Sequence, residues 1–159
     1  MPELIAPTVR LHRAWLEAHA EWGPGLHEDG FGLTATDEVE TQAGFAAWVR
    51  RLDARSDRCV FRWIVEDGSV LGGLALRHGD SEAIARAGHV GYGLRPSARG
   101  RGLGSWTLAR ALDEARILGI PRLLAVCAID NQASARTIER GGGVLEGVRD
   151  GARRYWIAL

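Results

Sequence analysis

One segment of the chain combines glycines and arginines at a spacing that can bind an anion. Residues 95–105 read RPSARGRGLGS, with glycines at positions 100, 102 and 104 and arginines at positions 95, 99 and 101. Glycine lets the main chain approach a ligand closely, and arginine adds positive charge. Where such a turn leads into a helix, free backbone N–H groups and the positive end of the helix dipole point at one place. The segment therefore predicts a site for a phosphate or a diphosphate.

Two familiar phosphate-binding motifs do not fit this segment. The Walker A motif requires a lysine, and the chain has 20 arginines but no lysine, which also excludes Schiff-base chemistry. A dinucleotide-binding G-x-G-x-x-G fingerprint would need a third glycine where Thr107 stands. A turn that binds no ligand stays as a further alternative. It is less favoured, because ordering so many glycines and arginines in a turn loses conformational entropy.

The elements around the segment are predicted from hydrophobic periodicity and from glycine and proline breaks. A strand over 88–94 precedes the turn, and a helix over about 102–118 follows it. The apolar run 122–128 is too continuous for a half-exposed strand, so we expect it inside the sheet. The other expected strands cover 7–11, 60–66, 70–78, 144–148 and 153–158; the other expected helices cover 12–22, 40–54 and 132–140; and 79–87 is expected to be a polar connection. This order predicts an α/β fold with a mixed sheet of about seven strands.

Length and composition indicate one ordinary globular domain over residues 1–159. The chain is 46% hydrophobic and 25% charged, and no apolar run approaches the length of a membrane span. The start of the chain lacks the basic region of a secretory signal, so we expect a cytoplasmic protein that does not bind membranes. The two cysteines, Cys59 and Cys127, stand alone, and no pair of histidines has metal-ligand spacing. We therefore expect neither disulfides nor a metal.

Charge is unevenly distributed along the chain. The formal net charge is zero, which does not suit a nucleic-acid-binding surface. Residues 14–49 contain seven acids and no arginine, whereas the remainder holds 20 arginines and 13 acids. This division suits a protein that meets an anion on one side and a cation on the other, or simply one with two solvated faces.

The glycine-rich turn resembles a known loop. Its spacing, Arg99-x-x-Gly102-x-Gly104, is similar to the R/Q-x-x-G-x-G/A pyrophosphate loop of the GNAT family of N-acetyltransferases. The segment DNQAS over 130–134 resembles the family's N-x-x-S segment, with Asn131 and Ser134 at the matching positions. The order of elements is similar from about residue 9 to the end of the chain. The resemblance implies the GNAT-like acyl-CoA N-acyltransferase fold, with helices on both faces of the sheet and the fourth and fifth strands splayed.

The resemblance also implies acetyl-coenzyme A as co-substrate. Its pyrophosphate would bind the main chain of 99–105, and its pantetheine arm would pair with the edge of 94–96 as an added strand does. Asn131 would hydrogen-bond the pantetheine, and Ser134 would lie near the thiol; Asn131 as a helix N-cap alone stays an alternative. The implied cofactor-binding residues are Leu94, Arg95, Pro96, Arg99, Gly100, Arg101, Gly102, Leu103, Gly104, Ser105, Asn131 and Ser134.

The sequence departs from the family pattern at two catalytic positions. Many members carry a tyrosine four residues after the serine, thought to protonate the leaving thiolate, and this chain has Ile138 there. Many also carry a glutamate base near the start of the fourth strand, where this chain has Gly88 and His89. His89 is a candidate base, because neutral imidazole can take a proton near pH 7, with a structural role as the alternative. Tyr92 and Tyr155 are candidate acids, although each could simply pack.

These features predict an N-acetyltransferase. The acetyl group would pass from acetyl-coenzyme A to a primary amine by direct attack in a ternary complex. In the family, the segment after the first strand walls the acceptor side, and in this chain that segment is the arginine-free stretch 14–49. We expect Glu28 and Asp29 to attract a small, cationic amine. Trp22, Phe31 or Trp48 would supply an apolar or cation–π wall.

A different class of protein stays open beside the enzyme. A non-catalytic module that senses acyl-coenzyme A would need neither the tyrosine nor the glutamate that this chain lacks. Release of the thiol in the presence of amines would separate the two functions, because a sensor binds without turnover. A homodimer also stays open.

Overall fold

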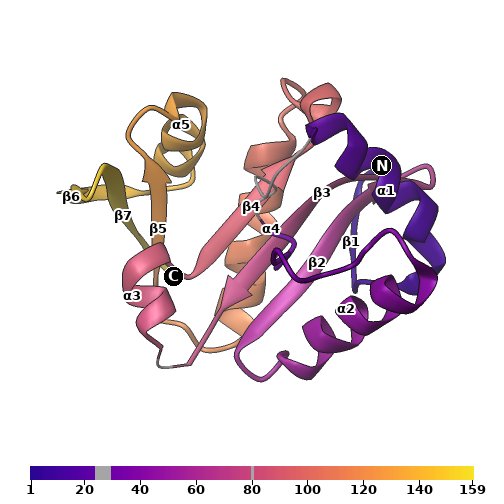
Figure 1. Ribbon diagram of the computed structural model, residues 1–159. Coiled ribbons are helices and arrows are strands. Elements are labelled where there is room, and N and C mark those ends of the chain that lie inside the picture. The colour runs from indigo at the N-terminus through magenta and orange to yellow at the C-terminus, as the bar shows by residue number, and fades with distance from the viewer. Residues whose placement is uncertain (24–29, 80) are drawn as a thin grey trace.

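Figure 1 shows the computed structural model, whose core is a seven-stranded sheet in the order β1-β2-β3-β4-β5-β7-β6. The structure describes residues 1–23, 30–79 and 81–159. The strands are β1 (Glu3–Ile5), β2 (Cys59–Glu66), β3 (Ser69–Arg77), β4 (Val90–Leu94), β5 (Arg122–Ala128), β6 (Val144–Arg149) and β7 (Ala152–Ala158). The α-helices are α1 (His12–Trp22), α2 (Gln42–Ala54), α3 (Glu82–Ala87), α4 (Leu103–Ile117) and α5 (Gln132–Arg140), and 3-10 turns cover Val9–Leu11 and Pro96–Ala98.

Different helices cover the two faces of the sheet (Figure 1). Helices α1 and α2 pack on one face through an aromatic core that includes Trp15, Trp48 and Trp63, all of them buried. Helices α4 and α5 pack on the other face through an aliphatic core that includes Leu108 and Ile138. The expectation of helices on both faces is confirmed. None of the helices that the structure describes is long and apolar enough to cross a membrane.

The sheet is nearly divided between β4 and β5. Strands β1 to β4 run antiparallel to their neighbours, and β5, β7 and β6 form a second antiparallel group. The two groups meet where β4 runs parallel to β5, and the register there holds one pair of residues, Val90 and Ala125. Beyond that pair the strands separate, so the expected splay is confirmed. The edge of β4 from Gly91 onward is free of β5.

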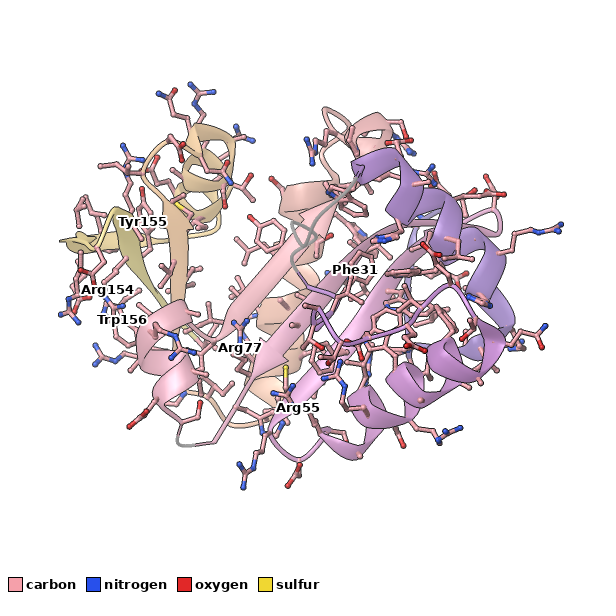
Figure 2. The ribbon with its side chains drawn as sticks, in the orientation of Figure 1. Phe31, Arg55, Arg77, Arg154, Tyr155 and Trp156 are labelled. Atoms are coloured by element: carbon pink, nitrogen blue, oxygen red, sulfur yellow. The ribbon has the colours of Figure 1, made fainter. Side chains whose placement is uncertain are left out.

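Helix α3 links the two halves of the sheet. From β3, Arg77 Nη1 donates to the Gly88 carbonyl oxygen at 3.2 Å; from β7, Arg154 Nη1 donates to the Ala85 carbonyl oxygen at 2.8 Å. Figure 2 shows Arg77 and Arg154 on either side of this helix. Both guanidinium groups therefore bind carbonyls at the C-terminal end of α3, where the helix dipole favours positive charge. One short helix is thereby tethered to both halves.

Two sequence-based predictions were wrong. The first strand is not 7–11 but Glu3–Ile5, which pairs with β2. Residues 9–11 form a 3-10 turn instead, because the Thr8 side chain accepts a hydrogen bond from Arg10 N and caps it. The connection over 79–87 contains α3, whose N-cap is Ser81 with its hydroxyl accepting from Ile84 N at 3.2 Å. The other elements are confirmed with ends shifted by up to two residues, and 122–128 does lie inside the sheet.

Gly88, at the closed end of the splay, should not tolerate a side chain. Its φ of 85° disfavours L-residues, and an added Cβ would lie 2.7 Å from the Leu124 carbonyl oxygen. Gly68 in the β2–β3 turn is a matched control, because its φ is 78° and an added Cβ would meet nothing within 4 Å. We expect Gly68→Ala to lower the free energy of unfolding by about 1 kcal/mol. Gly88→Ala should lower it by about 3 kcal/mol, because the clash is with main chain. Urea unfolding measures both values, and equal losses would contradict the steric account.

Candidate active site

A pocket of about 480 Å³ opens where β4 ends and α4 and α5 begin. It is lined from β4, from the glycine-rich turn, from the first turn of α4 and from α5. Nine of the twelve predicted cofactor-binding residues line it: Leu94, Arg99, Gly100, Gly102, Leu103, Gly104, Ser105, Asn131 and Ser134. The structure thus brings together the two sequence segments that carry the family resemblance. Arg95, Pro96 and Arg101 are not among the lining residues.

The glycine-rich turn leaves the start of α4 open to a ligand. Gly100 and Gly102 adopt φ of 78° and 79°, and the side of each that would carry a Cβ faces open space. Gly102 is the N-cap residue of α4, and no side chain caps the helix there. The N–H groups of the first turn therefore point outward without a side-chain acceptor, and this is the arrangement that binds phosphate at helix N-termini.

The arginines of the turn do not all serve the pocket. Arg95 Nη2 lies 3.1 Å from Glu21 Oε1, and Arg101 Nη2 lies 2.7 Å from Glu66 Oε1, so both guanidinium groups are engaged with carboxylates. Only Arg99 of the three lines the pocket, with its Nε donating to the Leu94 carbonyl oxygen at 3.0 Å. Of the two arginines expected to add charge to the cradle, Arg99 lines the pocket, and Arg101 is paired with Glu66 instead.

Helix α5 supplies positive charge that the sequence analysis missed. Arg136 and Arg140 line the pocket, together with Thr137 and Ala133. Arginines four residues apart share one face of a helix, and this face is continuous with that of Ser134. The signal was therefore present in the helical spacing over 132–140.

Glu21 fastens the turn to helix α1. Its Oε2 accepts a hydrogen bond from Ser97 N at 2.6 Å, and its Oε1 accepts from the Ser97 hydroxyl at 2.7 Å and from Arg95 Nε at 3.1 Å. The Ser97 N–H and hydroxyl, followed by Arg95, hold the pKa of Glu21 below its usual value. An acid of the arginine-free stretch thus binds the turn that precedes α4.

Asn131 serves as an N-cap and also lines the pocket. Its Oδ1 accepts a hydrogen bond from Ser134 N at 3.1 Å and so caps α5. The side-chain amide N–H groups do not take part in this bond and are available to a ligand. The cap and a cofactor contact are therefore compatible, since they use different atoms of one side chain.

Tyr92 brings a buried hydroxyl to the pocket. This hydroxyl is buried and has no hydrogen-bond partner among the described residues. The side chains of Ser134 and Thr137 lie near it, and burial raises the pKa of Tyr92 above its usual value. Ile138, at the position of the family tyrosine, is 2% exposed and packs in the aliphatic core. A tyrosine from β4 thus reaches the pocket, whereas position 138 faces away from it.

His89 holds the two strands together where they part. Its backbone N–H donates to the Leu124 carbonyl oxygen at 2.8 Å, and its Nδ1 accepts a hydrogen bond from Leu124 N at 2.8 Å. Burial lowers the pKa of His89, so the neutral ring with its proton on Nε2 is favoured. A ring in this state has no free lone pair for an incoming ammonium. The geometry contradicts the expectation of a general base and gives His89 a structural role.

Tyr155 is directed away from the pocket. It is 1% exposed, and its hydroxyl donates to Glu139 Oε2 at 2.7 Å. Burial and the neighbouring carboxylate raise the pKa of Tyr155 to about 12. The hydroxyl proton of Tyr155 is already donated to Glu139. Tyr155 is also not among the residues that line the pocket. The expectation that it could act as the acid is therefore not supported by the geometry.

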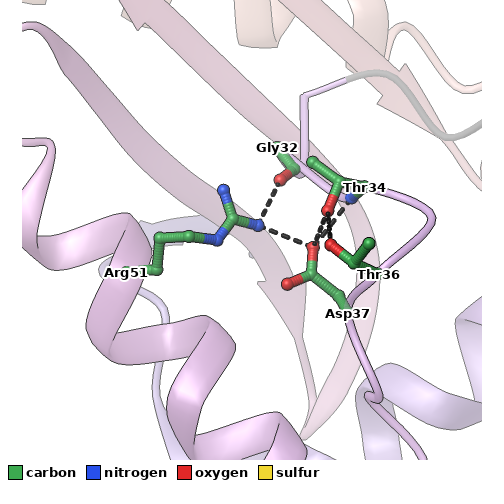
Figure 3. A network of polar contacts seen from close by, with 5 residues as sticks. All are labelled: Gly32, Thr34, Thr36, Asp37 and Arg51. Carbon is green, nitrogen blue, oxygen red and sulfur yellow. Dashed lines mark hydrogen bonds and ion pairs between the residues drawn. The ribbon is translucent and has the colours of Figure 1, made fainter.

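Two of the predicted acceptor-binding residues, Trp22 and Phe31, contact each other in the aromatic core. Phe31 lies edge-on to the half-buried Trp22 with ring centroids 5.6 Å apart. Phe31 and Trp48 are each 1% exposed, so neither presents a face to a ligand. Glu28 and Asp29 lie outside the described residues. Asp37, another acid of the stretch, accepts from Arg51 Nη2 at 2.6 Å and closes a local network with two threonines (Figure 3).

Comparison with known proteins gives the family of the chain. The model of the family described as "Acetyltransferase (GNAT) domain" matches residues 17–144. No curated protein matches the chain. Solved structures with the same fold include RimL, a ribosomal alpha-N-protein acetyltransferase, in complex with coenzyme A. It is 24% identical, with a TM-score of 0.73 over 99% of this chain and 94% of that one.

Two further structures share the fold. RimJ of Mycobacterium smegmatis, in complex with CoA-disulfide, is 22% identical, with a TM-score of 0.75 over 99% of this chain and 81% of that one. The microcin C7 self immunity acetyltransferase MccE, in complex with acetyl-CoA and AMP, is 16% identical, with a TM-score of 0.73 over 99% of this chain and 92% of that one. At these identities the likeness establishes the fold.

The role of His89 can be tested by replacing Nδ1 with another acceptor. In His89→Asn the side-chain oxygen can take the place of Nδ1, whereas His89→Ala leaves the Leu124 N–H without a partner. We expect His89→Ala to lower the free energy of unfolding by about 2 kcal/mol and His89→Asn to lower it by less than about 1 kcal/mol. Equal losses in the two variants would show that the hydrogen bond does not matter.

The same contact predicts a pH dependence. The pKa of His89 is lower in the folded protein than in the unfolded chain. The contribution of neutral His89 to the free energy of unfolding is therefore complete above pH of about 6.5. It is lost as the pH falls toward the pKa of His89 in the folded protein. The unfolded chain takes up a proton there that the folded ring resists. Urea unfolding at pH values from about 7.5 to 5 should show this fall in the free energy of unfolding for the wild-type protein. His89→Asn should lack it, because asparagine does not titrate in this range.

Proposed function

The chain belongs to the GNAT acetyltransferase family, and on that premise we propose that the protein transfers an acetyl group from acetyl-coenzyme A to a primary amine. One observation carries the proposal: the pocket at the end of β4, where the uncapped start of α4 meets Arg99, Asn131 and Ser134. RimL, RimJ and MccE, which share the fold, were solved with coenzyme A, CoA-disulfide and acetyl-CoA, respectively.

The residues of the pocket fit coenzyme A in charge and shape. The open amides of the turn and Arg99 suit the diphosphate, and Arg136 and Arg140 suit a further phosphate of the same molecule. A second pocket of about 330 Å³ between α4 and α5 shares Ser105, Thr137 and Arg140 with the first and gives room for the nucleotide. The free edge of β4 can pair with the amides of the pantetheine arm as a neighbouring strand would.

We assign the chemistry to the splayed strands and to Tyr92. The acetyl thioester of the co-substrate supplies the group that is transferred. Backbone N–H groups of β4, left without partners on β5, can stabilise the oxyanion that develops when the amine attacks the carbonyl carbon. The Tyr92 hydroxyl, protonated at neutral pH, can donate its proton to the departing thiolate, with Ser134 beside it, and the proton that the amine loses on forming the amide restores the hydroxyl. No covalent acyl-enzyme is needed.

A sensor of acyl-coenzyme A is the second candidate function. It is favoured by the burial of Ile138 and by the loss of a free lone pair on His89, which leave the chain without the family's acid and base positions. Against it stands the Tyr92 hydroxyl, which reaches the pocket beside Ser134 and can serve as a proton donor at a position other than that of the family tyrosine.

Binding of the co-substrate tests the assignment of the pocket. We expect the double variant Arg136→Gln/Arg140→Gln to raise the Kd for acetyl-coenzyme A by about tenfold or more, because two charged contacts to phosphate are lost. The control is Arg13→Gln, an exposed arginine on α1, which should leave the Kd unchanged. Isothermal titration calorimetry measures both. Absence of any heat with the wild-type protein would refute the proposed function.

Turnover separates the enzyme from the sensor and tests Tyr92. Thiol release from acetyl-coenzyme A with a panel of amines should be observed for the wild-type protein. Tyr92→Phe keeps the ring but removes the proton donor, so kcat should fall by about 100-fold while the Kd for acetyl-coenzyme A stays the same. Tyr155→Phe serves as the matched control, with kcat nearly unchanged. Full activity of Tyr92→Phe would exclude it as the acid, and binding without thiol release for every amine would favour the sensor.

A further inference from the structure

A further cavity, separate from the two pockets beside α4 and α5, lies against the opposite face of β5. It has a volume of about 530 Å³ and is formed between α3, β7 and the turn that joins β6 to β7. Its floor is apolar, with Ala85, Val126 and Ala152, and three arginines stand around it, namely Arg86, Arg149 and Arg154. We call this cavity the arginine cleft. Its volume is large enough for a small organic molecule or for the end of a peptide.

The arginine cleft is separated from the candidate reaction site by one strand. Successive residues of a strand point to opposite faces, so Val126 faces the cleft and Cys127 faces α5. On that second face, Cys127 lies close to Ser134, and the Tyr92 side chain packs in the same core. The cleft is therefore next to the point where the thioester is expected, on the other side of β5.

The arginine cleft and the coenzyme A pocket lie on different sides of β5. Coenzyme A in its pocket would occupy the α4–α5 side of β4 and β5. The cleft lies on the face that carries Val126, and β4 and β5 share no register pair beyond Val90 and Ala125. An acceptor held in the cleft would therefore approach the thioester from the side that coenzyme A leaves open.

Arg154 is held in place before any ligand binds. Its side chain is 11% exposed, its Nε donates to Glu146 Oε2 at 3.0 Å, and its Nη1 donates to the Ala85 carbonyl oxygen at 2.8 Å. Figure 2 shows it beside α3. An arginine fixed in this way presents its remaining N–H groups without a further loss of rotamer freedom, which distinguishes it from a mobile surface charge. The cleft is thus a preformed site for an anionic group.

The charges around the cleft are of both signs. Glu82 and Asp150 line it together with the three arginines, and Glu146 is paired with Arg154 at the rim. Arg86 and Arg149 form no ion pair with a described residue, so their guanidinium groups are available to an anion. The anionic group of an acceptor can pair with them, whereas a simple cation would leave them unpaired.

We propose that the arginine cleft binds the anionic group, a carboxylate or a phosphate, of a zwitterionic acceptor whose amino group is the one acetylated. This inference rests on the proposed function and names the class of acceptor for the same site. It differs from the small cationic amine expected from the arginine-free stretch, two acids of which, Glu21 and Asp37, are engaged with Arg95 and Arg51.

Matched pairs of acceptors test the proposal. Tyrosine and tyramine differ by a carboxylate, and O-phosphoethanolamine and ethanolamine differ by a phosphate. For at least one pair we expect kcat/KM of the anionic member to exceed that of its partner by about tenfold or more, because charge-assisted hydrogen bonds form. The pair that shows the preference identifies the anion. A preference for tyramine and ethanolamine over their anionic partners would overturn the proposal.

The arginines must account for the preference. Arg86 and Arg149 are exposed, so the double variant Arg86→Gln/Arg149→Gln is expected to fold. It should reduce the preference for the anionic member by about tenfold, and Arg13→Gln should leave the preference as in the wild-type protein. An unchanged preference in the double variant would overturn the assignment of the cleft.

A binding measurement distinguishes failure of this proposal from failure of the proposed function. Calorimetric titration of the four probes into protein saturated with coenzyme A needs no turnover. Tight binding of an anionic probe that is weakened in the double variant supports the cleft even if no amine is acetylated. Two results would refute the assignment of the cleft: turnover of tyramine or ethanolamine at the same kcat/KM as their anionic partners, or absence of binding by both anionic probes. Neither result bears on acetyl transfer, which the release of thiol tests separately.

Discussion

The separation of β4 from β5 directly after Val90 is the constraint on which the rest of the site depends. It leaves the edge of β4 free beside the pocket on the α4–α5 side, and the arginine cleft lies on the other face of β5. Three neighbouring features fix the point of separation: the positive φ of Gly88, the double contact of His89 with Leu124, and the tethering of α3 from both halves of the sheet. A small set of contacts thus determines where the two strands part.

Arginine side chains have two roles in this chain, which contains no lysine. Some guanidinium groups join elements of the fold, as Arg77 and Arg154 do on α3, and as Arg95 does with Glu21. Others, Arg136 and Arg140 among them, line a pocket and are available to an anion. The planar guanidinium can do both because its several donors fit carbonyls, carboxylates and phosphates alike. Arg154 has both roles, because its hydrogen bond to α3 also fixes the orientation of its side chain in the arginine cleft.

Most of the fold could be predicted from the sequence, because its longer elements carry clear periodicity and clear breaks. The hairpin at Asp67–Gly68 is one example, since both residues adopt positive φ there. The errors concern short segments. Strand β1 has three residues and owes its existence to pairing with β2, and α3 has six and depends on a serine cap and on two distant arginines. Segments of this length carry too little periodicity for a pattern to identify them.

The sequence by itself determined the glycine-rich turn before α4, the cap at Asn131 and the membership of the family, because these depend on local backbone conformation and on residues close together in the chain. Tertiary structure alone decided which arginines stay free, which tyrosine reaches the pocket and whether His89 keeps a lone pair. The reason is physical: a polar side chain takes its partner from whatever element packs against it. Glu21 and Ser97 are 76 residues apart, and only the folded chain brings the carboxylate to that hydroxyl.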